Sequence, residues 1–231
     1  MGTAYRHVRV FASNREQTED AAEVFEHDDT VVVVLADGVG GIHGGVTASR
    51  ALVAAVKSAM SDAAHRLGDV RSWGDLFRTT DATLTKSMAG QTTGVVVALS
   101  AGKLIGVSAG DSEAWLVEAN RVENLTVGQD TKGRIGSGHV APTGFERLGF
   151  LDGVLVVASD GLFKYAAANV IARIVRESPI GVAAEQLIEL VRLPSGKFPD
   201  DVTAVLVSGV EGSWGVHPRR ASATAKSARG R

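Results

Sequence analysis

The chain of 231 residues is 45% hydrophobic and 22% charged, which is enough to bury a sizeable core in one large domain or two small ones. Its 24 basic and 26 acidic residues give a formal net charge of -2, so no global attraction to nucleic acid or to a membrane is expected. The chain has no cysteine, which excludes disulfides, zinc–thiolate sites and a cysteine nucleophile. No apolar run is long enough for a signal peptide or a membrane span, so we expect a soluble, cytoplasmic protein.

Short apolar runs separated by turn residues predict strands. The clearest run, at 31–35, contains four valines and a leucine, which is typical of a strand buried on both faces. Runs of this kind predict strands at 7–12, 30–36, 93–99, 104–108, 114–117, 154–158 and 202–207.

Four segments carry apolar residues at helical spacing. They lie at 47–67, at 75–88, at 167–176, and after Ser178, with Ser178 as the predicted cap and Pro179 at the first helical position. Two helices therefore follow the second strand and two precede the last one. Helices in pairs between short-linked strands predict an α+β sandwich rather than regular βαβ alternation.

Composition divides the chain into a domain and a tail. We expect one domain over residues 1–210 and a disordered basic tail at 211–231, where small and basic residues replace apolar ones. Inside the domain, residues 127–147 are glycine-rich and weakly patterned. A loop of this length in a compact domain is usually functional or mobile.

Aspartates stand at the ends of three predicted strands. Asp37 directly follows the strand at 30–36, Asp160 follows the one at 154–158, and Asp200 with Asp201 precedes the one at 202–207. Each alone is compatible with ordinary turn chemistry. In an antiparallel or mixed sheet, however, these ends can lie side by side. The positions together predict an oxygen-ligand site for a hard cation such as Mg²⁺, Mn²⁺ or Ca²⁺.

The glycine-rich stretch 37–45 suggests a second interpretation, because it follows a predicted strand and precedes a predicted helix. It has His43 where a dinucleotide-binding loop has its third glycine, and it lacks the Gly-Lys-Ser/Thr ending of a P-loop. We therefore do not predict a nucleotide site there.

Five short motifs, in order along residues 6–209, resemble those of the metal-dependent PPM, or type 2C, serine/threonine protein phosphatases, especially the compact bacterial branch. Each motif is weak alone, and their common order carries the resemblance. The motifs are Arg15-Glu16-Gln17-Thr18-Glu19-Asp20; Ala36-Asp37-Gly38-Val39-Gly40-Gly41; Thr92-Thr93-Gly94 with Ala109-Gly110-Asp111-Ser112; Ala158-Ser159-Asp160-Gly161-Leu162; and Asp200-Asp201-Val202-Thr203.

The resemblance implies an αββα sandwich of two mainly antiparallel sheets flanked by helix pairs, with the site between the sheet ends. It implies hydrolysis of phosphoserine and phosphothreonine in proteins by a water or hydroxide that bridges two Mn²⁺ or Mg²⁺ ions. The residues it assigns to catalysis are Arg15, Asp37, Asp160 and Asp200. Asp37 would bridge the two ions, Asp160 and Asp200 would complete the ligands of one, and Arg15 would hold the substrate phosphate.

The remaining metal ligands are implied in the same way. Glu19 and the Gly38 carbonyl would serve the other core ion, and Asp20 would act mainly through bound water. Asp111, with Asp160, would support a third, weaker ion of the bacterial branch. Thr18 and Asp201 both stand where the family usually has asparagine. The second of these departures leaves the choice of ligand between Asp200 and Asp201 open.

The partners that the resemblance implies are phosphoserine and phosphothreonine proteins, among them a Hanks-type kinase or its substrates. No nucleic acid or membrane partner is expected, and a monomer is. Two alternatives stay open. The first is a catalytically weak binding or regulatory protein of the PPM fold, and the second is a metal-dependent phosphoesterase acting on small phosphate esters.

Overall fold

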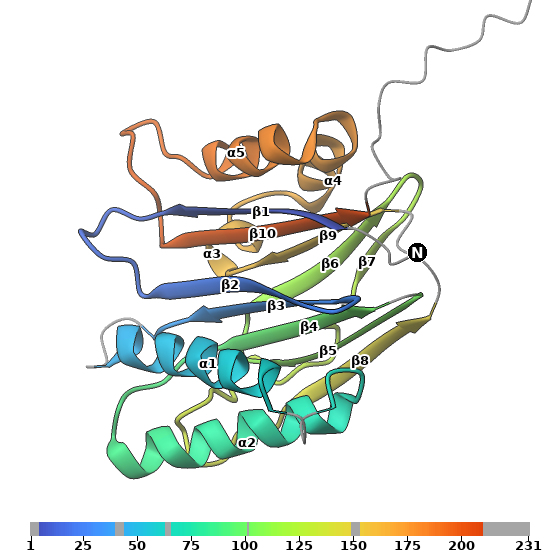
Figure 1. The fold of residues 1–231 in the computed structure, drawn as a ribbon. Helices are drawn as coiled ribbons and strands as arrows, with labels where there is room; N and C mark the ends of the chain where they lie inside the picture. The colour runs from blue at the N-terminus through green and yellow to red at the C-terminus, as the bar shows by residue number, and fades with distance from the viewer. Residues whose placement is uncertain (1–4, 40–43, 63–65, 101, 149–152, 210–231) are drawn as a thin grey trace, which may run out of the picture.

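The strands pair into two five-stranded sheets that stack face to face, with helices on both outer surfaces (Figure 1). The computed structural model describes residues 5–39, 44–62, 66–100, 102–148 and 153–209. All pairings between its strands are antiparallel. The predicted α+β class and αββα arrangement are confirmed.

The two sheets draw on different parts of the chain. In spatial order, the first contains β1 (Tyr5–Ala12), β10 (Val202–Gly209), β9 (Gly153–Ala158), β6 (Glu113–Glu118) and β7 (Val122–Asn124). The second contains β2 (Asp20–His27), β3 (Thr30–Asp37), β4 (Gly94–Ser100), β5 (Lys103–Ala109) and β8 (Thr143–Leu148). The first sheet is covered by α3 (Asp160–Phe163), α4 (Ala168–Glu177) and α5 (Ile180–Leu190), and the second by α1 (Gly45–Met60) and α2 (Val70–Ser87).

The valine run of β3 shows why the sequence builds these layers. Successive side chains of a strand point to opposite faces. Val32 and Val34 pack with the helices α1 and α2, while Val33 and Leu35 pack between the two sheets. The run is therefore buried on both faces, as its composition predicts.

Several predictions of the elements are wrong in detail. Three strands, β2, β7 and β8, were not predicted because they are edge strands with many polar residues. β8 overlaps the end of the segment 127–147 that was interpreted as a loop. The last helix begins at Ile180 with Pro179 as its cap, and the Ser178 hydroxyl bonds to Gln186 at 2.9 Å instead of capping the helix.

Other expectations lie outside the described residues. These include the predicted basic tail at 211–231 and His43, so the domain boundary at 210 stays a prediction. Of the helices that the structure does describe, none has both the length and the apolar character needed to cross a membrane.

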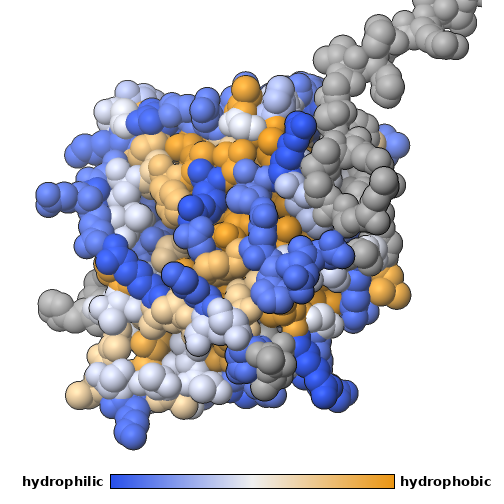
Figure 2. All heavy atoms as spheres, viewed as in Figure 1, coloured by the Kyte–Doolittle hydropathy of each residue, from blue (hydrophilic) through white to orange (hydrophobic). Residues whose placement is uncertain are grey.

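The first strands of the two sheets lie at the same side of the sandwich, and ion pairs join them. Arg9 on β1 pairs with Glu23 on β2 at 2.7 Å and donates a hydrogen bond of 2.7 Å to the Ala22 carbonyl. In the space-filling view, hydrophilic side chains cross a band of hydrophobic surface in this region (Figure 2). On β1, Phe11 is a large apolar side chain that is 44% exposed.

The layer between the sheets should carry much of the stability. Leu155 is fully buried there, whereas Leu148, at the end of β8, is 70% exposed. Leu155→Ala should lower the free energy of unfolding by about 2–5 kcal/mol, because it leaves a cavity between two rigid sheets. Leu148→Ala, the matched control, should change it by less than about 0.5 kcal/mol. Urea unfolding measures both, and equal losses would contradict the assignment of Leu155 to the core.

Candidate active site

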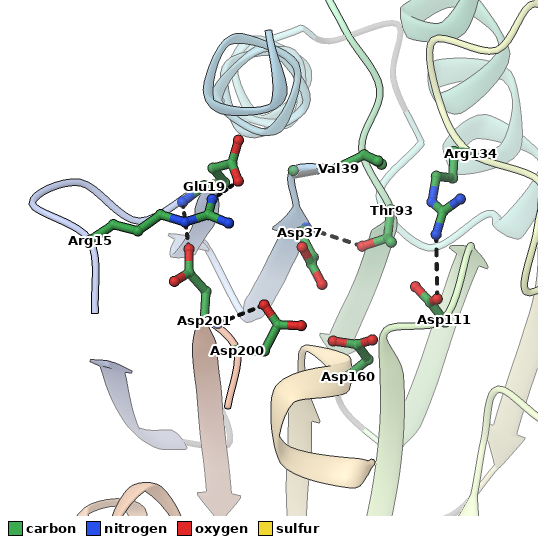
Figure 3. Close-up of a pocket in the computed structure, with 11 residues that line it drawn as sticks. Arg15, Glu19, Asp37, Val39, Thr93, Asp111, Arg134, Asp160, Asp200 and Asp201 are labelled. Carbon is green, nitrogen blue, oxygen red and sulfur yellow. Dashed lines mark hydrogen bonds and ion pairs between the residues drawn. The ribbon is translucent and has the colours of Figure 1, made fainter. Parts of the chain in front are cut away.

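A pocket of about 330 Å³ lies at one end of the sandwich, where the connections of both sheets meet (Figure 3). All the predicted site residues except Asp20 line it. The full lining is Arg15, Glu19, Asp37, Gly38, Val39, Thr93, Asp111, Arg134, Asp160, Asp200 and Asp201.

Strand pairing explains how distant acids reach this pocket. β9 and β10 are antiparallel neighbours with Ala158 opposite Ala204, so the end of β9 and the start of β10 lie together. Asp160 follows the first and Asp200 precedes the second. Asp37 ends β3 in the other sheet. The predicted convergence of these three carboxylates is confirmed, and it occurs across two sheets.

Asp37 is held through its backbone by the segment before β4. Its N–H donates to the Thr93 hydroxyl at 3.0 Å, and its carbonyl accepts from Thr93 N at 2.8 Å and from the Thr92 hydroxyl at 2.9 Å. The Thr93 hydroxyl also shares a hydrogen bond of 2.7 Å with Ser112, next to Asp111. The two threonines, to which the motif resemblance gives no role, thus fix where the Asp37 carboxylate stands.

Asp111 projects from the turn between β5 and β6. Gly110 starts this turn with φ +93°, and a Cβ there would lie 2.7 Å from the Thr93 side chain. A larger residue at Gly110 would therefore strain the backbone and push on the segment that holds Asp37.

Burial and the charges of neighbouring carboxylates both raise the pKa values of the pocket aspartates. Burial, followed by the charges of Asp20, Asp160 and Asp111, raises the pKa of Asp37 to about 10. Burial, followed by the charges of Asp111 and Asp200, raises the pKa of Asp160. These directions mean that the cluster resists full ionisation unless positive charge is added to it.

Asp20 lies behind the pocket, directly opposite Asp37 in the β2–β3 pairing. It is 6% exposed, and burial is the main cause that raises its pKa to about 6. Its carboxylate lies near the hydroxyls of Ser159 and Thr203, but neither carboxylate oxygen has a well-aligned hydrogen bond within the described part of the chain. Buried polar atoms without partners often mark the place of a water or an ion.

Asp200 and Asp201 have different surroundings. The Asp201 carboxylate is buried and accepts hydrogen bonds from the Ser13 hydroxyl at 2.5 Å, the Thr18 hydroxyl at 3.0 Å and Glu19 N at 2.9 Å. The Asp200 side chain is exposed and points toward Asp37 and Asp160 (Figure 3). Asp200 Oδ1 accepts a hydrogen bond of 2.9 Å from Asp201 N, whereas the Asp201 carboxylate accepts the three bonds above. The geometry therefore favours Asp200 over Asp201 as the residue that can offer oxygen to a ligand.

The two departures from the family pattern, Thr18 and Asp201, contact each other. The Thr18 hydroxyl donates to Asp201 and accepts from Asp20 N at 3.1 Å. Together they tie the segment that carries Glu19 to the start of β10. The sequence alone does not reveal this link, because 183 positions separate the two residues.

Two arginines stand on opposite sides of the carboxylates (Figure 3). Arg15 forms an ion pair with Glu19, and Arg134 Nη2 lies 3.6 Å from Asp111 Oδ2. Sequence reasoning missed Arg134, which belongs to the weakly patterned segment 127–147. Its neighbour Ile135 is fully buried. This lone apolar residue in a glycine-rich segment was the only sign in the sequence that the segment packs against the domain.

The donor set fits a hard divalent cation in its chemistry. It consists of carboxylate and carbonyl oxygens. A bound cation would lower the raised pKa of Asp37 and would give the unpartnered oxygens of Asp20 a positive charge nearby. The carboxylates are nevertheless spread around the walls. Among the residues with described positions, no three acidic or histidine side chains are already grouped to hold an ion. They would have to draw together on binding, and Glu19 and Asp111 would have to leave their arginine partners.

The fold is that of bacterial serine/threonine phosphatases. Stp1 from Staphylococcus aureus superposes with a TM-score of 0.75 at 23% identity, over 90% of this chain and 96% of that one. The catalytic domain of the phosphatase PstP, solved with two manganese ions, gives 0.73 at 22% identity, over 89% and 98%. PppA, a regulatory component of the T6SS in Pseudomonas aeruginosa, gives 0.75 at 18% identity, over 90% and 99%.

These likenesses confirm the architecture that the motif resemblance implies. At the level of sequence, the chain matches no protein-family model and no curated protein.

Burial of Asp37, together with the nearby carboxylates, should make the stability of the metal-free protein fall as pH rises. The folded state keeps a proton on Asp37 up to about pH 10, whereas the unfolded chain releases it near pH 4. Folding therefore loses stability between these values, by at most about 1.4 kcal/mol per pH unit for this one proton. Asp37→Asn stays neutral, so in EDTA it should flatten the pH dependence and exceed the wild type in stability at pH 8.5.

Urea unfolding in EDTA at pH 6 and pH 8.5 measures this difference. Asp29→Asn, in the exposed β2–β3 turn, is the matched control and should keep the slope of the wild type. The same pH slope in wild type and Asp37→Asn would show that Asp37 ionises normally.

Proposed function

We propose that the protein is a metal-dependent phosphatase of the PPM type, which hydrolyses phosphoserine and phosphothreonine in proteins. The observation that carries the proposal is the convergence of Asp37, Asp160, Asp200 and Asp111 in one pocket with an arginine on each side. The shared fold of the bacterial phosphatases supports it, and so does the order of the five sequence motifs. The manganese ions in the PstP structure belong to that protein, and Mn²⁺ or Mg²⁺ in this chain is part of the proposal.

The proposed ligands follow from position in the pocket. Asp37 stands centrally and would be shared by two ions, with Asp160 and Asp200 serving one of them. Glu19 and the Gly38 carbonyl would serve the other. Asp20, buried behind Asp37, would act through water, and Asp111 with Asp160 would hold a third, weaker ion. A bound divalent ion supplies a water of lowered pKa and positive charge against the phosphoryl oxygens.

The chain's own residues do the rest. Thr92 and Thr93 keep the Asp37 carboxylate in place while its environment changes. Arg15, whose side chain is 49% exposed at the pocket wall, can turn its planar guanidinium from Glu19 to a phosphate and donate two hydrogen bonds. The same movement frees Glu19 for an ion. No protein nucleophile takes part in this scheme.

The substrates we propose are phosphoproteins, including a Hanks-type kinase or its substrates, and a cytoplasmic location belongs to the same proposal. A catalytically weak binding protein of this fold is disfavoured by the presence of every acid that the motifs require. Hydrolysis of small phosphate esters is the remaining alternative. A comparison of phosphopeptides with nucleotides as substrates separates this alternative from protein phosphatase activity.

The purified protein should release phosphate from phosphothreonine peptides in Mn²⁺ or Mg²⁺. EDTA should stop the reaction because the carboxylates alone provide no activated water, and added Mn²⁺ should restore it. A nucleotide panel in the same assay should react more slowly than the peptides. Full activity after exhaustive chelation would refute the proposal, and faster hydrolysis of nucleotides would favour the small-ester alternative.

Adjacent aspartates should respond differently to the same substitution. Asp200→Asn removes a proposed ligand and should lower turnover at least about 100-fold, roughly 2.7 kcal/mol of transition-state stabilisation. Asp201→Asn should stay within about threefold, because an asparagine oxygen can still accept from Thr18 and Glu19 N while its NH₂ meets the Ser13 hydroxyl.

Turnover against Mn²⁺ concentration, measured for both variants, decides whether Asp200 or Asp201 is the metal ligand. If Asp201→Asn is inactive and Asp200→Asn is nearly normal, the ligand at this strand is Asp201 and not Asp200. Normal activity in both variants would remove this strand end from the site.

A further inference from the structure

A carboxylate outside the pocket fixes the loop that carries Arg134. Asp81 on α2 is 5% exposed and accepts hydrogen bonds from Gly136 N at 2.6 Å, Gly138 N at 3.0 Å and Val140 N at 3.4 Å. Hydrogen bonds to an ionised acceptor are stronger than neutral ones. Three of them on one buried side chain hold the loop against the helix.

The backbone beside Arg134 is fixed from the other direction as well. Ile135 is fully buried and exchanges two hydrogen bonds of 2.9 Å with Thr92, one of the two threonines that bond to the backbone of Asp37. Gly136 follows with φ +98°, and a Cβ there would lie 2.3 Å from the Gly90 carbonyl oxygen. The chain at Arg134 therefore has little freedom to move away from the pocket.

The guanidinium of Arg134 reaches into the pocket and makes one loose ion pair. Its Nη2 lies 3.6 Å from Asp111 Oδ2, and the two side chains are 32% and 33% exposed. Arg134 Nε is buried and has no hydrogen-bond partner in the part of the chain that the structure describes. The same loop contacts the Asp111 turn through its backbone, where Gly110 N donates to the Asp130 carbonyl at 3.2 Å.

We propose that Arg134, aimed by the Asp81 clamp, is a built-in cation on Asp111 that competes with a divalent metal ion for this carboxylate. The inference rests on the proposed function in one respect, namely that Asp111 serves a metal site. A guanidinium and a divalent ion repel at this range, so the arginine must leave before the ion can use the carboxylate fully. Arg134 thereby sets the ion concentration at which the weakest site fills. Asp81 is a positioning residue, because it acts on this site only by holding the loop that carries Arg134.

The strength of the competition follows from the geometry. A long ion pair that is one-third exposed contributes little, so an ion can displace the arginine without unfolding the loop. Arg134→Met keeps the length of the side chain without its charge, and should tighten the weakest Mn²⁺ site about fivefold, equal to about 1 kcal/mol at 1.4 kcal/mol per tenfold. Asp81→Asn keeps the shape but loses the charge of the clamp, and should tighten the site about twofold.

Binding of Mn²⁺ to the full chain tests this without reference to catalysis. The signal of free Mn²⁺ in electron paramagnetic resonance gives the isotherm for the wild type, Arg134→Met, Arg134→Lys and Asp81→Asn. The matched control is Arg147→Met, on β8, whose partners Glu118 and Glu123 lie outside the pocket. The control and Arg134→Lys, which keeps the charge, should follow the wild type.

The outcomes separate the two proposals. An unchanged or weakened isotherm in folded Arg134→Met, or in Arg134→Gln if the methionine variant does not fold, would overturn the competition. A purely structural role for Asp81 would lower the melting temperature of Asp81→Asn and leave its isotherm unchanged, which would overturn the positioning role. A wild type that binds Mn²⁺ but hydrolyses no phosphopeptide would refute the proposed function while the competition stands. A wild type that binds no Mn²⁺ would refute both.

Discussion

Repulsion among carboxylates held at the ends of two stacked sheets is the constraint around which this molecule is arranged. Asp37 comes from one sheet, and Asp160 and Asp200 from the other, so neither sheet alone creates the site. The two arginine pairs offset only part of the repulsion. The apolar layers on both sides of each sheet keep the strand ends in place, because close-packed side chains resist the displacement that the charges favour.

The same constraint accounts for the way the site is supported from behind. Thr92 and Thr93 bond to the backbone of Asp37 and not to its carboxylate. The Asp201 carboxylate accepts hydrogen bonds from the segment before β2, and Asp200 faces the pocket. Charged groups that face the pocket are thus held by neutral or fully bonded neighbours, which is how a rigid site is built from groups that repel.

The sequence predicted the features that depend on local residue patterns. It did not predict the features that depend on contacts between distant segments. The valines of β3 predicted a doubly buried strand, and the aspartates at strand ends predicted a group of acids that the structure brings into one pocket. Both predictions follow from positions next to each other in the chain. β2 and β8 were missed because edge strands need few apolar residues. Arg134 was missed because the Thr92–Ile135 bridge that places it joins distant segments. The choice between Asp200 and Asp201 needed hydrogen-bond partners that only the fold supplies.

The ion pairs between β1 and β2 have a consequence for the behaviour of the protein at high concentration. Both strands are sheet edges, and an open edge can recruit a strand from another chain and begin aggregation. Arg9 already occupies the Ala22 carbonyl and the Glu23 carboxylate. An incoming strand would have to displace this guanidinium and desolvate its charge before it could pair with β2. The arginine therefore acts as a charged guard on this edge of the second sheet.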